Sequence, residues 1–325
     1  MNRSFQALAA IALAMVGLGA HAADVQATAY PQKPIKIVIP YSAGGGTDQY
    51  MRIVSERAAK SLGQPITIIN KPGGSTVIGM KSVINSAPDG YTLLVSTNTS
   101  YSLIPYAIKP APYSPAESLD YVGVVGETAM VVTANSSMPD SLQEVIARAK
   151  AEPGRYTYAS YGVGSSTHLA AEVFMADTDT ELRHIPYKGV EAVTALAGKQ
   201  VDLMVDGVNA ASAMIAAGKT KALVVLQQKR SEFLPNTPTL AEAGYPNATA
   251  STISYVMAAP KGTPAPIINK VHLAFVEALR DPDVLDQIKA VRTSPAYLGP
   301  EEAKQFVEQQ SASFKAIVEK KGIQF

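Results

Sequence analysis

Short apolar runs, rich in β-branched residues, alternate with amphipathic stretches along most of this chain. In the first hundred residues these runs predict strands at 35–39, 66–70 and 92–96. Between them, apolar positions recur every three or four residues and predict helices at 47–62 and 77–85. Strands that alternate with helices are typical of βαβ units with parallel strands.

The alternation resumes after a long apolar stretch at 122–133, which predicts an extended strand that leads away from the first unit. A second unit follows, with strands predicted at 156–160, 184–186, 201–205 and 222–226 and helices at 141–151, 167–176, 190–197 and 209–217. The run at 253–259 predicts a strand that returns to the first unit. Helices predicted at 264–280, 282–290 and 300–321 complete the chain, each with Pro in its first turn.

This order predicts an α/β protein with two lobes, each a mixed sheet flanked by helices. We expect the first lobe to comprise residues 23–132 and 255–325 and the second lobe residues 133–254. Two crossing strands would join the lobes and leave a cleft between them. Such a cleft suits the capture of a small ligand by hinge closure.

The N-terminus has the three regions of a secretory signal peptide. Arg3 is followed by an apolar run at 7–18 and then by Ala20-His21-Ala22, which has the small-x-small form of a cleavage site. We expect residues 1–22 to be removed near Ala22 or Ala23; the alternative is an N-terminal anchor helix. No later stretch approaches the roughly 20 apolar residues of a membrane span. The expected product is a soluble periplasmic protein.

Charge and cysteine content exclude several classes of protein. The 325 residues include 28 Lys and Arg against 27 Asp and Glu, and loss of Arg3 with the signal peptide leaves 27 of each. A neutral chain without basic tracts argues against nucleic-acid binding, which depends on phosphate neutralisation. The absence of cysteine excludes disulfides, thiolate nucleophiles, Cys-ligated zinc and a lipoprotein anchor.

A glycine-rich loop at 40–48 (Pro-Tyr-Ser-Ala-Gly-Gly-Gly-Thr-Asp) lies between a predicted buried strand and a helix start. Glycines let backbone N–H groups converge, and a helix N-terminus favours negative charge, so the loop suits a carboxylate or phosphate. Thr47 and Asp48 are also good N-cap residues for that helix. A plain strand–helix turn is the alternative.

A second loop of this kind lies at 162–168 (Gly-Val-Gly-Ser-Ser-Thr-His). One hydroxyl is enough to cap the following helix, which leaves two for a ligand carboxylate. His168 could satisfy a backbone carbonyl at the helix start or bind a ligand. Asp206 ends a predicted buried strand, where it could contact a ligand in the crevice or cap the next helix.

Enzyme signatures are incomplete. Residues 40–44 resemble a nucleophile elbow in which Pro replaces the first glycine. The chain beyond the signal peptide offers His168, His184 and His272 as bases, too widely spaced for a zinc motif. The Gly-x-Gly at 162–164 lacks the rest of a dinucleotide fingerprint. We expect no cofactor and no metal; a periplasmic hydrolase that uses Ser42 or Ser165 is the alternative.

Eight motifs in order resemble the solute receptors of tripartite tricarboxylate transporters, the TctC or Bug family, from about Pro31 to Phe325. They are Tyr30-Pro31-x-Lys33-Pro34-Ile35, Gly-Gly-Gly-Thr-Asp at 44–48, Asn70-Lys71-Pro72-Gly73, Ala-Pro-Asp-Gly-Tyr-Thr-Leu at 87–93, Gly164-Ser165-x-x-His168-Leu169-Ala170, His-Ile-Pro-Tyr-Lys-Gly at 184–189, Gln-Val-Asp-Leu-Met at 200–204 and Pro238-Thr239-Leu240-x-Glu242-Ala243-Gly244-Tyr245-Pro246. The chain departs from the family at Tyr41, where Phe is frequent, and at Gly74-Ser75-Thr76, where Ala-Gly-Gly is usual. Val205 and Tyr255 replace a frequent Phe and Trp.

The resemblance implies a type II-like periplasmic binding protein, or Venus flytrap, without catalytic activity. It would bind a small carboxylate and deliver it to membrane transporter subunits, with a sensor role as another possibility; we expect a monomer. The site residues carried over are Tyr41, Gly45, Gly46, Thr47, Asp48, Thr97 and Asn98 in the first lobe and Ser165, Ser166, Thr167, His168, Tyr187 and Asp206 in the second. The ligand could be a di- or tricarboxylate or an acidic amino acid. Tyr41, Tyr161 and Tyr187 near the cleft would also suit an aromatic carboxylate.

Overall fold

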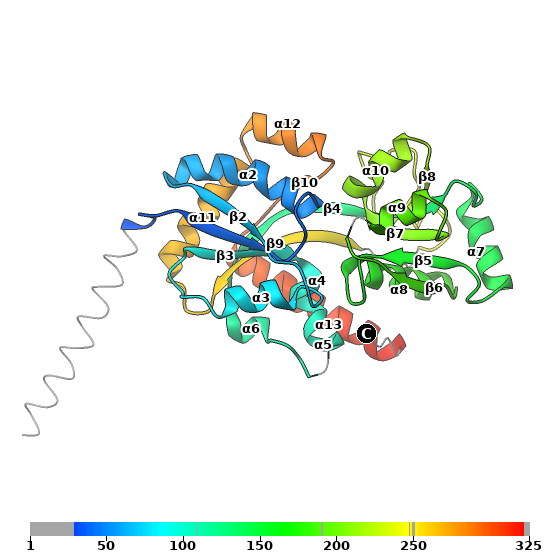
Figure 1. Ribbon diagram of the computed structural model, residues 1–325, viewed down its shortest axis with the longest axis horizontal. Coiled ribbons are helices and arrows are strands. Elements are labelled where there is room, and N and C mark those ends of the chain that lie inside the picture. Colours follow the sequence, from blue (N-terminus) through cyan, green and yellow to red (C-terminus); the bar gives the residue numbers. More distant parts are fainter. Residues whose placement is uncertain (1–28, 109, 190, 247, 249–250, 322–325) are drawn as a thin grey trace, which may run out of the picture.

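The computed structural model describes residues 29–108, 110–189, 191–246, 248 and 251–321. The predicted signal peptide therefore lies outside the described residues. Within the described ranges, no helix combines the length and the apolar character that a membrane crossing requires. Figure 1 shows two α/β lobes side by side, joined by strands that pass from one to the other.

The first lobe is built on a sheet whose first three strands are parallel, as predicted. In spatial order its strands are β2 (Ile66–Asn70), β1 (Ile35–Ile39), β3 (Thr92–Thr97), β9 (Thr252–Pro260), β4 (Leu119–Asn135) and β10 (Ser294–Leu298). Its helices are α2 (Gly46–Leu62), α3 (Val77–Ile84), α4 (Asn98–Ser102), α5 (Ile104–Ala107), α6 (Pro115–Ser118), α11 (Ala265–Ala278), α12 (Pro282–Ala290) and α13 (Pro300–Lys321). Helices α2 and α12 lie on one side of this sheet and α3 and α13 on the other (Figure 1).

The second lobe contains a smaller mixed sheet. Its strands are β7 (Leu203–Gly207), β5 (Thr157–Ser160), β6 (Arg183–Pro186) and β8 (Thr220–Val225), and its helices are α7 (Leu142–Ala151), α8 (Ser166–Thr178), α9 (Glu191–Ala197) and α10 (Val208–Ala216). Strands β7, β5 and β6 are parallel, so the carboxyl ends of β5 and β7 lie at the same edge. Loops that follow these ends face the first lobe, which is where a crevice site is expected.

Strand β4 joins the two sheets. Its residues 119–129 pair with β9, and its residues 130–135 pair with β7 and β8. Almost the whole strand is buried, which explains its nearly continuous apolar sequence. The pairing changes between Ala129 and Met130, so this point and the start of β9 are the connections about which the lobes can rotate.

Several local predictions need correction. Gly45, not Thr47 or Asp48, is the N-cap of α2, and no side chain caps this helix. The short helices α4, α5 and α6 and the strand β10 were not predicted. Strand β10 contains Pro295 and pairs with β4, far away in sequence, so no local pattern marks it.

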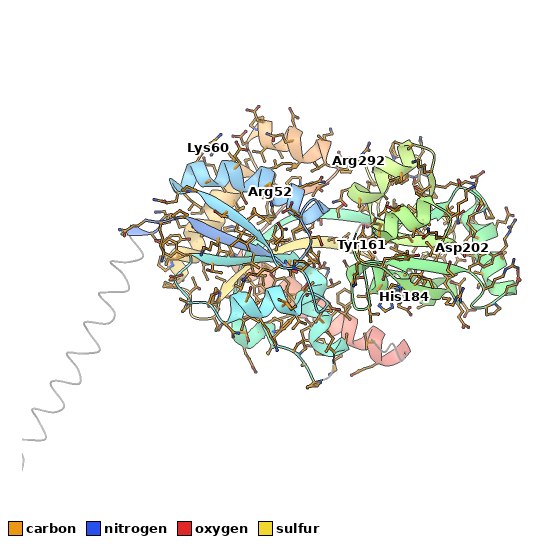
Figure 2. All side chains as sticks on the ribbon, viewed as in Figure 1. Arg52, Lys60, Tyr161, His184, Asp202 and Arg292 are labelled. Atoms are coloured by element: carbon orange, nitrogen blue, oxygen red, sulfur yellow. The ribbon has the colours of Figure 1, made fainter. Side chains whose placement is uncertain are left out.

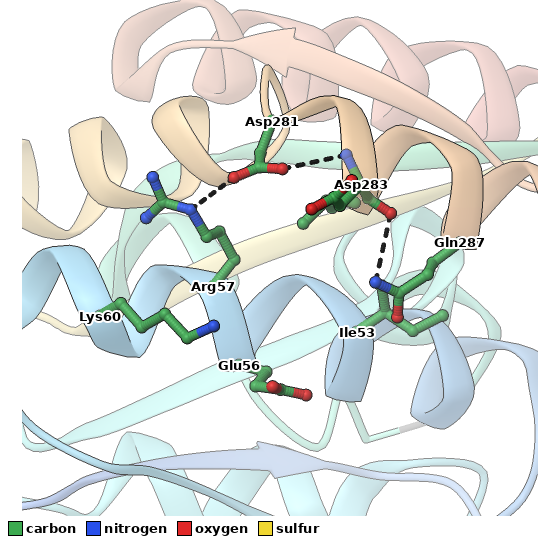
Figure 3. A pocket seen from close by; sticks show the side chains of 8 residues that line it. Ile53, Glu56, Arg57, Lys60, Asp281, Asp283 and Gln287 are labelled. Carbon is green, nitrogen blue, oxygen red and sulfur yellow. Dashed lines mark hydrogen bonds and ion pairs between the residues drawn. The ribbon is translucent and has the colours of Figure 1, made fainter.

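Helix α2 is fastened at its far end by ion pairs. Arg57 donates to the carboxylates of Asp281 (2.7 Å) and Glu277 (2.8 Å), and Asp281 also caps α12. Arg57 and Asp281 border a small cavity of about 130 Å³ between α2 and α12 (Figure 3). The cavity lies on the outer side of the lobe; its ion pairs fix the position of α2, whose N-terminus carries the glycine-rich loop.

Candidate functional site

The Asp48 side chain organises the glycine-rich loop of the first lobe. Its carboxylate accepts hydrogen bonds from the backbone N–H of Gly44 (2.9 Å), from Nε and Nη2 of Arg52 (3.0 and 2.9 Å) and from Nδ2 of Asn70 (3.0 Å). Burial would raise the pKa of Asp48, but these hydrogen bonds outweigh it and hold the pKa below its ordinary value. Asp48 is therefore ionised at neutral pH, and its hydrogen bond with the N–H of Gly44 holds the loop in place.

The same arrangement leaves backbone donors at the start of α2. The first N–H groups of an α-helix have no partner within the helix, and here no side chain caps them. The N–H groups of Gly44 and Gly45 are already engaged, with Asp48 and with the carbonyl of Ser42. The N–H groups of residues 46–48 thus form a convergent set of donors beside a positive helix-dipole end, which suits a carboxylate.

Tyr41 and Thr97 come together in a cluster of hydroxyl groups. The Tyr41 hydroxyl lies 2.7 Å from Oγ1 of Thr97, 3.1 Å from Oγ of Ser96 and 3.2 Å from Oγ of Ser100. The carbonyl of Tyr41 also accepts a hydrogen bond from Asn70 (3.1 Å). These contacts connect the loops after β1, β2 and β3 into one rigid surface.

Asn98 is turned toward the body of the first lobe. Its Nδ2 donates to Oε1 of Gln310 in α13 (2.6 Å), and its Oδ1 accepts from the backbone N–H of Ser254 in β9 (3.2 Å). Only 2% of Asn98 is exposed. This side chain links α4 to α13 and β9 rather than presenting a polar group to the cleft.

In the second lobe, hydroxyl groups order the loop between β5 and α8. Ser165 is the N-cap of α8, and its Oγ accepts from the backbone N–H of His168 (3.2 Å). Oγ1 of Thr167 accepts from the backbone N–H of Tyr161 (3.0 Å) and lies 3.1 Å from Oγ of Ser165. Ser166 is half-buried in the first turn of α8. Two of the three hydroxyls are thus engaged in the structure of the loop.

Two stacked imidazoles support this loop. The rings of His168 and His184 lie 4.0 Å apart at 9°, and His184 stacks in turn on Tyr158. Nδ1 of His168 accepts from the N–H of Gly164 (3.1 Å), and Nε2 of His184 lies 2.6 Å from Oγ of Ser160. Burial, with the repulsion of His184, lowers the pKa of His168 to about 3, and burial lowers the pKa of His184 to about 4. Both rings are neutral at neutral pH.

Asp206 and Tyr161 are in direct contact at the ends of β7 and β5. Oδ2 of Asp206 accepts from the Tyr161 hydroxyl (2.7 Å), and Oδ1 accepts from the N–H of Gly207 (2.7 Å). Burial raises the pKa of Asp206 to about 7, although both hydrogen bonds oppose this. Gly207 is the N-cap of α10, so Asp206 does not cap that helix. Tyr161 lies where the lobes face each other (Figure 2). Tyr161 and Tyr187 both pack against a small hydrophobic cluster that includes Leu196 and Met204.

The loops of the two lobes touch. Oγ of Ser75 donates to the carbonyl of Val163 (2.8 Å), and Nδ2 of Asn209 in α10 donates to the hydroxyl of Tyr255 in β9 (3.3 Å). A Cβ on Gly189 would lie 3.9 Å from Oγ of Ser42. The lobes are therefore closed on one another.

Sequence reasoning missed several of these residues. Arg52 follows Asp48 by four positions, a spacing that predicts an ion pair on one helix face. Asn70 ends a predicted strand, another available signal. Asn209 and Val163 carry no such signal, because their contacts depend on how the lobes meet.

The geometry also bears on the hydrolase alternative. A serine hydroxyl and an imidazole lie within hydrogen-bond distance at Ser160 and His184, but Ser160 is fully buried in β5. The hydroxyl of Ser165 accepts the capping hydrogen bond of α8.

Comparison with known proteins agrees with this geometry. Residues 50–323 match the family model described as the tripartite tricarboxylate transporter family receptor. The chain is 37% identical to the "UPF0065 protein in gbd 5'region" of Cupriavidus necator. The alignment extends over 326 residues and covers 99% of this chain and 98% of the relative.

Solved structures of similar proteins share the two-lobed fold. The periplasmic binding protein BugD is 32% identical with a TM-score of 0.84, over 91% of this chain and 99% of BugD. MatC of Rhodopseudomonas palustris with bound malate is 27% identical with a TM-score of 0.82, over 89% of this chain and 100% of MatC. Rpa4515 of R. palustris with adipate is 27% identical with a TM-score of 0.85, over 91% of this chain and 99% of Rpa4515. The chain belongs to the family of tripartite tricarboxylate transporter receptors.

Proposed function

We propose that this protein is a periplasmic receptor that encloses a small organic carboxylate between its lobes, without chemical conversion. The observation that carries the proposal is the donor set at residues 46–48, held at the start of α2 by the buried Asp48 and directed at the closed interface between the lobes. A donor set that is fixed before the ligand arrives binds with little loss of conformational freedom. The loop contains no lysine or arginine, and a carboxylate that accepts several N–H groups needs none.

We propose an aliphatic dicarboxylate as the ligand. The similar proteins of R. palustris were solved with malate and adipate, which are both of this class. One carboxylate would bind at residues 46–48. The other end would meet the second lobe at Ser166 and the neighbouring residues of α8, where the supporting imidazoles are neutral and add no fixed charge.

The proposal includes the place and the partners of the protein. The predicted signal peptide at 1–22 directs the chain to the periplasm, where it acts as a monomer. There the closed, liganded form would present a single surface made from both lobes to the membrane subunits of a tripartite transporter. The open form lacks that surface, so delivery follows capture.

A thermal-shift screen of the protein from Ala23 onward tests the proposal. The acids are malate, adipate, succinate, citrate, glutamate, aspartate and benzoate. A ligand at 100 times its Kd adds about 2.7 kcal/mol of stability, which a melting curve resolves. We expect the largest shifts from malate, adipate and succinate.

Other outcomes would contradict part or all of the proposal. Shifts from benzoate alone would keep the receptor and overturn the ligand class, and shifts from glutamate or aspartate alone would replace the proposed ligands by acidic amino acids. The absence of any shift, together with the absence of an organic acid in mass spectra of the unfolded protein, would contradict the receptor. Turnover of an ester that Ser165→Ala abolishes would support the hydrolase instead.

A further inference from the structure

Asn209 of the second lobe lies directly against the glycine-rich loop of the first. A Cβ placed on Gly46 would be 2.1 Å from Nδ2 of Asn209, so the Asn209 amide would have to move before a side chain could fit there. Gly46 has ordinary helical backbone, so its conformation does not require glycine. The amide of Asn209 instead occupies the space that a side chain at position 46 would fill.

The orientation of this amide follows from its contacts. Oδ1 accepts from the backbone N–H of Ala210 (2.9 Å), so Nδ2 is the atom that points toward the first lobe. Nδ2 donates one hydrogen to the hydroxyl of Tyr255 (3.3 Å). Burial raises the pKa of Tyr255 above its ordinary range, against the opposing effect of hydrogen bonding with Thr293, Asn209 and Thr47, so Thr47 lies near the same hydroxyl.

The Asn209 amide nitrogen therefore sits among Gly46, Thr47 and Tyr255, beside the donor set at the start of α2. An amide nitrogen carries two hydrogens, and the contact with Tyr255 uses one. The other is available to an acceptor bound at that donor set.

We propose that Asn209 is a ligand-binding residue: on closure it adds a second-lobe N–H donor to the carboxylate held by residues 46–48, and Gly46 is glycine to admit it. The inference rests on the proposed function and adds to it one contact, between Asn209 and the bound carboxylate, which can form only in the closed state. Asn209 thereby couples occupancy of the first-lobe loop to closure. Ligands that present a carboxylate, with two acceptor oxygens for donors from both lobes, are favoured over neutral or single-acceptor groups.

The contact between Gly46 and Asn209 can be tested without a ligand, because the chain has no cysteine of its own. Cysteines at Ser42 and Gly189 report closure, since a Cβ on Gly189 lies 3.9 Å from Oγ of Ser42, within reach of a disulfide. Gly189 has a φ of 59°, so a cysteine there is strained, but every variant compared carries the same strain. The rate of cross-link formation under a fixed oxidant measures how often the lobes close.

In this double-cysteine protein we expect Gly46→Ala to slow cross-linking by about tenfold, the effect of roughly 1.4 kcal/mol against closure. The matched control is Gly45→Ala, because a Cβ on Gly45 meets only the carbonyl of Ser42, at 3.4 Å. Adding Asn209→Ala to Gly46→Ala should restore the rate. Equal rates for Gly46→Ala and Gly45→Ala, or no rescue, would overturn the proposed fit.

The role of Asn209 in binding is tested by titration calorimetry with malate and adipate. We expect Asn209→Ala to weaken binding about tenfold, and Asn209→Asp to weaken it further because a carboxylate then faces the bound anion. Asn236→Ala, at an exposed asparagine of the same lobe, is the control. Unchanged affinity of Asn209→Ala with an unchanged melting temperature would refute the donor role. If neither acid binds the unsubstituted protein, the proposed function fails for this ligand class, whereas the cross-linking rates still decide whether Asn209 and Gly46 meet.

Discussion

The two facing loops achieve the same order by different chemistry. The first-lobe loop at 40–48 is fixed by the buried, ionised carboxylate of Asp48. This carboxylate accepts hydrogen bonds from the N–H of Gly44, the guanidinium of Arg52 and the amide of Asn70. The second-lobe loop at 162–168 is fixed by hydroxyls and neutral imidazoles. In the first loop one charged residue, Asp48, makes all of these contacts, and Arg52 balances its charge. In the second loop several uncharged residues share the contacts that hold the backbone.

This difference predicts unequal sensitivity to substitution. Asp48 alone makes four hydrogen-bond contacts that hold the first loop. In the second loop Ser165, Thr167 and His168 each make a separate backbone contact. One substitution should therefore disorder the first loop, and one substitution should only loosen the second.

Asp48→Ala should have the largest effect. It leaves the N–H of Gly44 and one hydrogen of the Asn70 amide without an acceptor, while the other amide hydrogen keeps its bond to the carbonyl of Tyr41. This should cost about 2 kcal/mol of unfolding free energy and reduce affinity for malate or adipate about thirtyfold. Urea denaturation and calorimetry measure both quantities. Gln49→Ala is the control, because its Nε2 donates to the carbonyl of Gly44 at the exposed edge of the same loop. Equal losses in the two variants would mean that Asp48 has no special role.

Asp206→Asn should give the next largest effect, with a distinctive pH dependence. Because the pKa of Asp206 rises to about 7 in the folded protein, the folded state holds a proton between pH 3.8 and 7 that the unfolded state releases. The stability due to this group is complete below pH 3.8, decreases as the pH rises toward 7 and is lost once the pH has passed through 7. The amide removes that loss, so the variant should gain about 2 kcal/mol over the unsubstituted protein between pH 5 and pH 8. A constant difference across this range would contradict the raised pKa.

Thr167→Ala tests how the second loop tolerates a single loss. The buried N–H of Tyr161 loses its acceptor, but Ser165 and His168 still hold the loop. We expect a loss of about 1 kcal/mol in stability and about fivefold in affinity. Thr178→Ala removes another buried hydroxyl of α8, bonded to the carbonyl of Phe174, and should lower stability without a change in affinity. A thirtyfold loss with Thr167→Ala would show that the two loops are equally fragile.

The sequence predicts the framework better than it predicts these loops. The strands at 35–39 and 66–70 are predicted to the residue, because each is a short apolar run bounded by turn residues. Helix α4 depends on the contact of Asn98 with Gln310, 212 positions away, and has no local pattern of its own. Patterns within about ten residues determine strands and long helices, and contacts between distant segments determine the rest.

The same limit applies to the candidate site. The glycine-rich loop at 40–48 and the hydroxyl loop at 162–168 are visible because each interrupts a strand–helix pattern with unusual residues. The sequence presents Asp48 as a cap or a ligand contact, and only the folded chain shows that its carboxylate accepts from Gly44, Arg52 and Asn70. In the sequence, Asn209 is simply a polar residue at the start of a helix. Its contact with the first lobe becomes visible only when the two lobes are placed together.

Ser75 offers the smallest and most selective test, because it joins the two compared regions. Its hydroxyl donates to the carbonyl of Val163, in the second loop, while its backbone has a φ of 50°, which is unfavourable for a residue other than glycine. Ser75→Ala removes the hydrogen bond and keeps the strain, whereas Ser75→Gly removes both. Each should lower affinity about threefold, since a partly exposed hydrogen bond between the lobes contributes only about 0.5–1 kcal/mol to closure.

The two variants should differ in stability without a ligand. Ser75→Gly should be more stable than Ser75→Ala by about 1 kcal/mol, because glycine adopts this backbone conformation without a steric penalty. Ser82→Ala, whose hydroxyl donates to the carbonyl of Gly79 within α3, controls for loss of a serine hydroxyl and should leave affinity unchanged. Lower affinity combined with higher stability in Ser75→Gly would show that the hydrogen bond contributes to closure and not to folding. A change in folding alone alters the free energy of unfolding without lowering the affinity of the folded receptor for its ligand. If affinity is unchanged in both variants, the bond to Val163 forms without contributing to capture, and closure depends on the contacts around the glycine-rich loop.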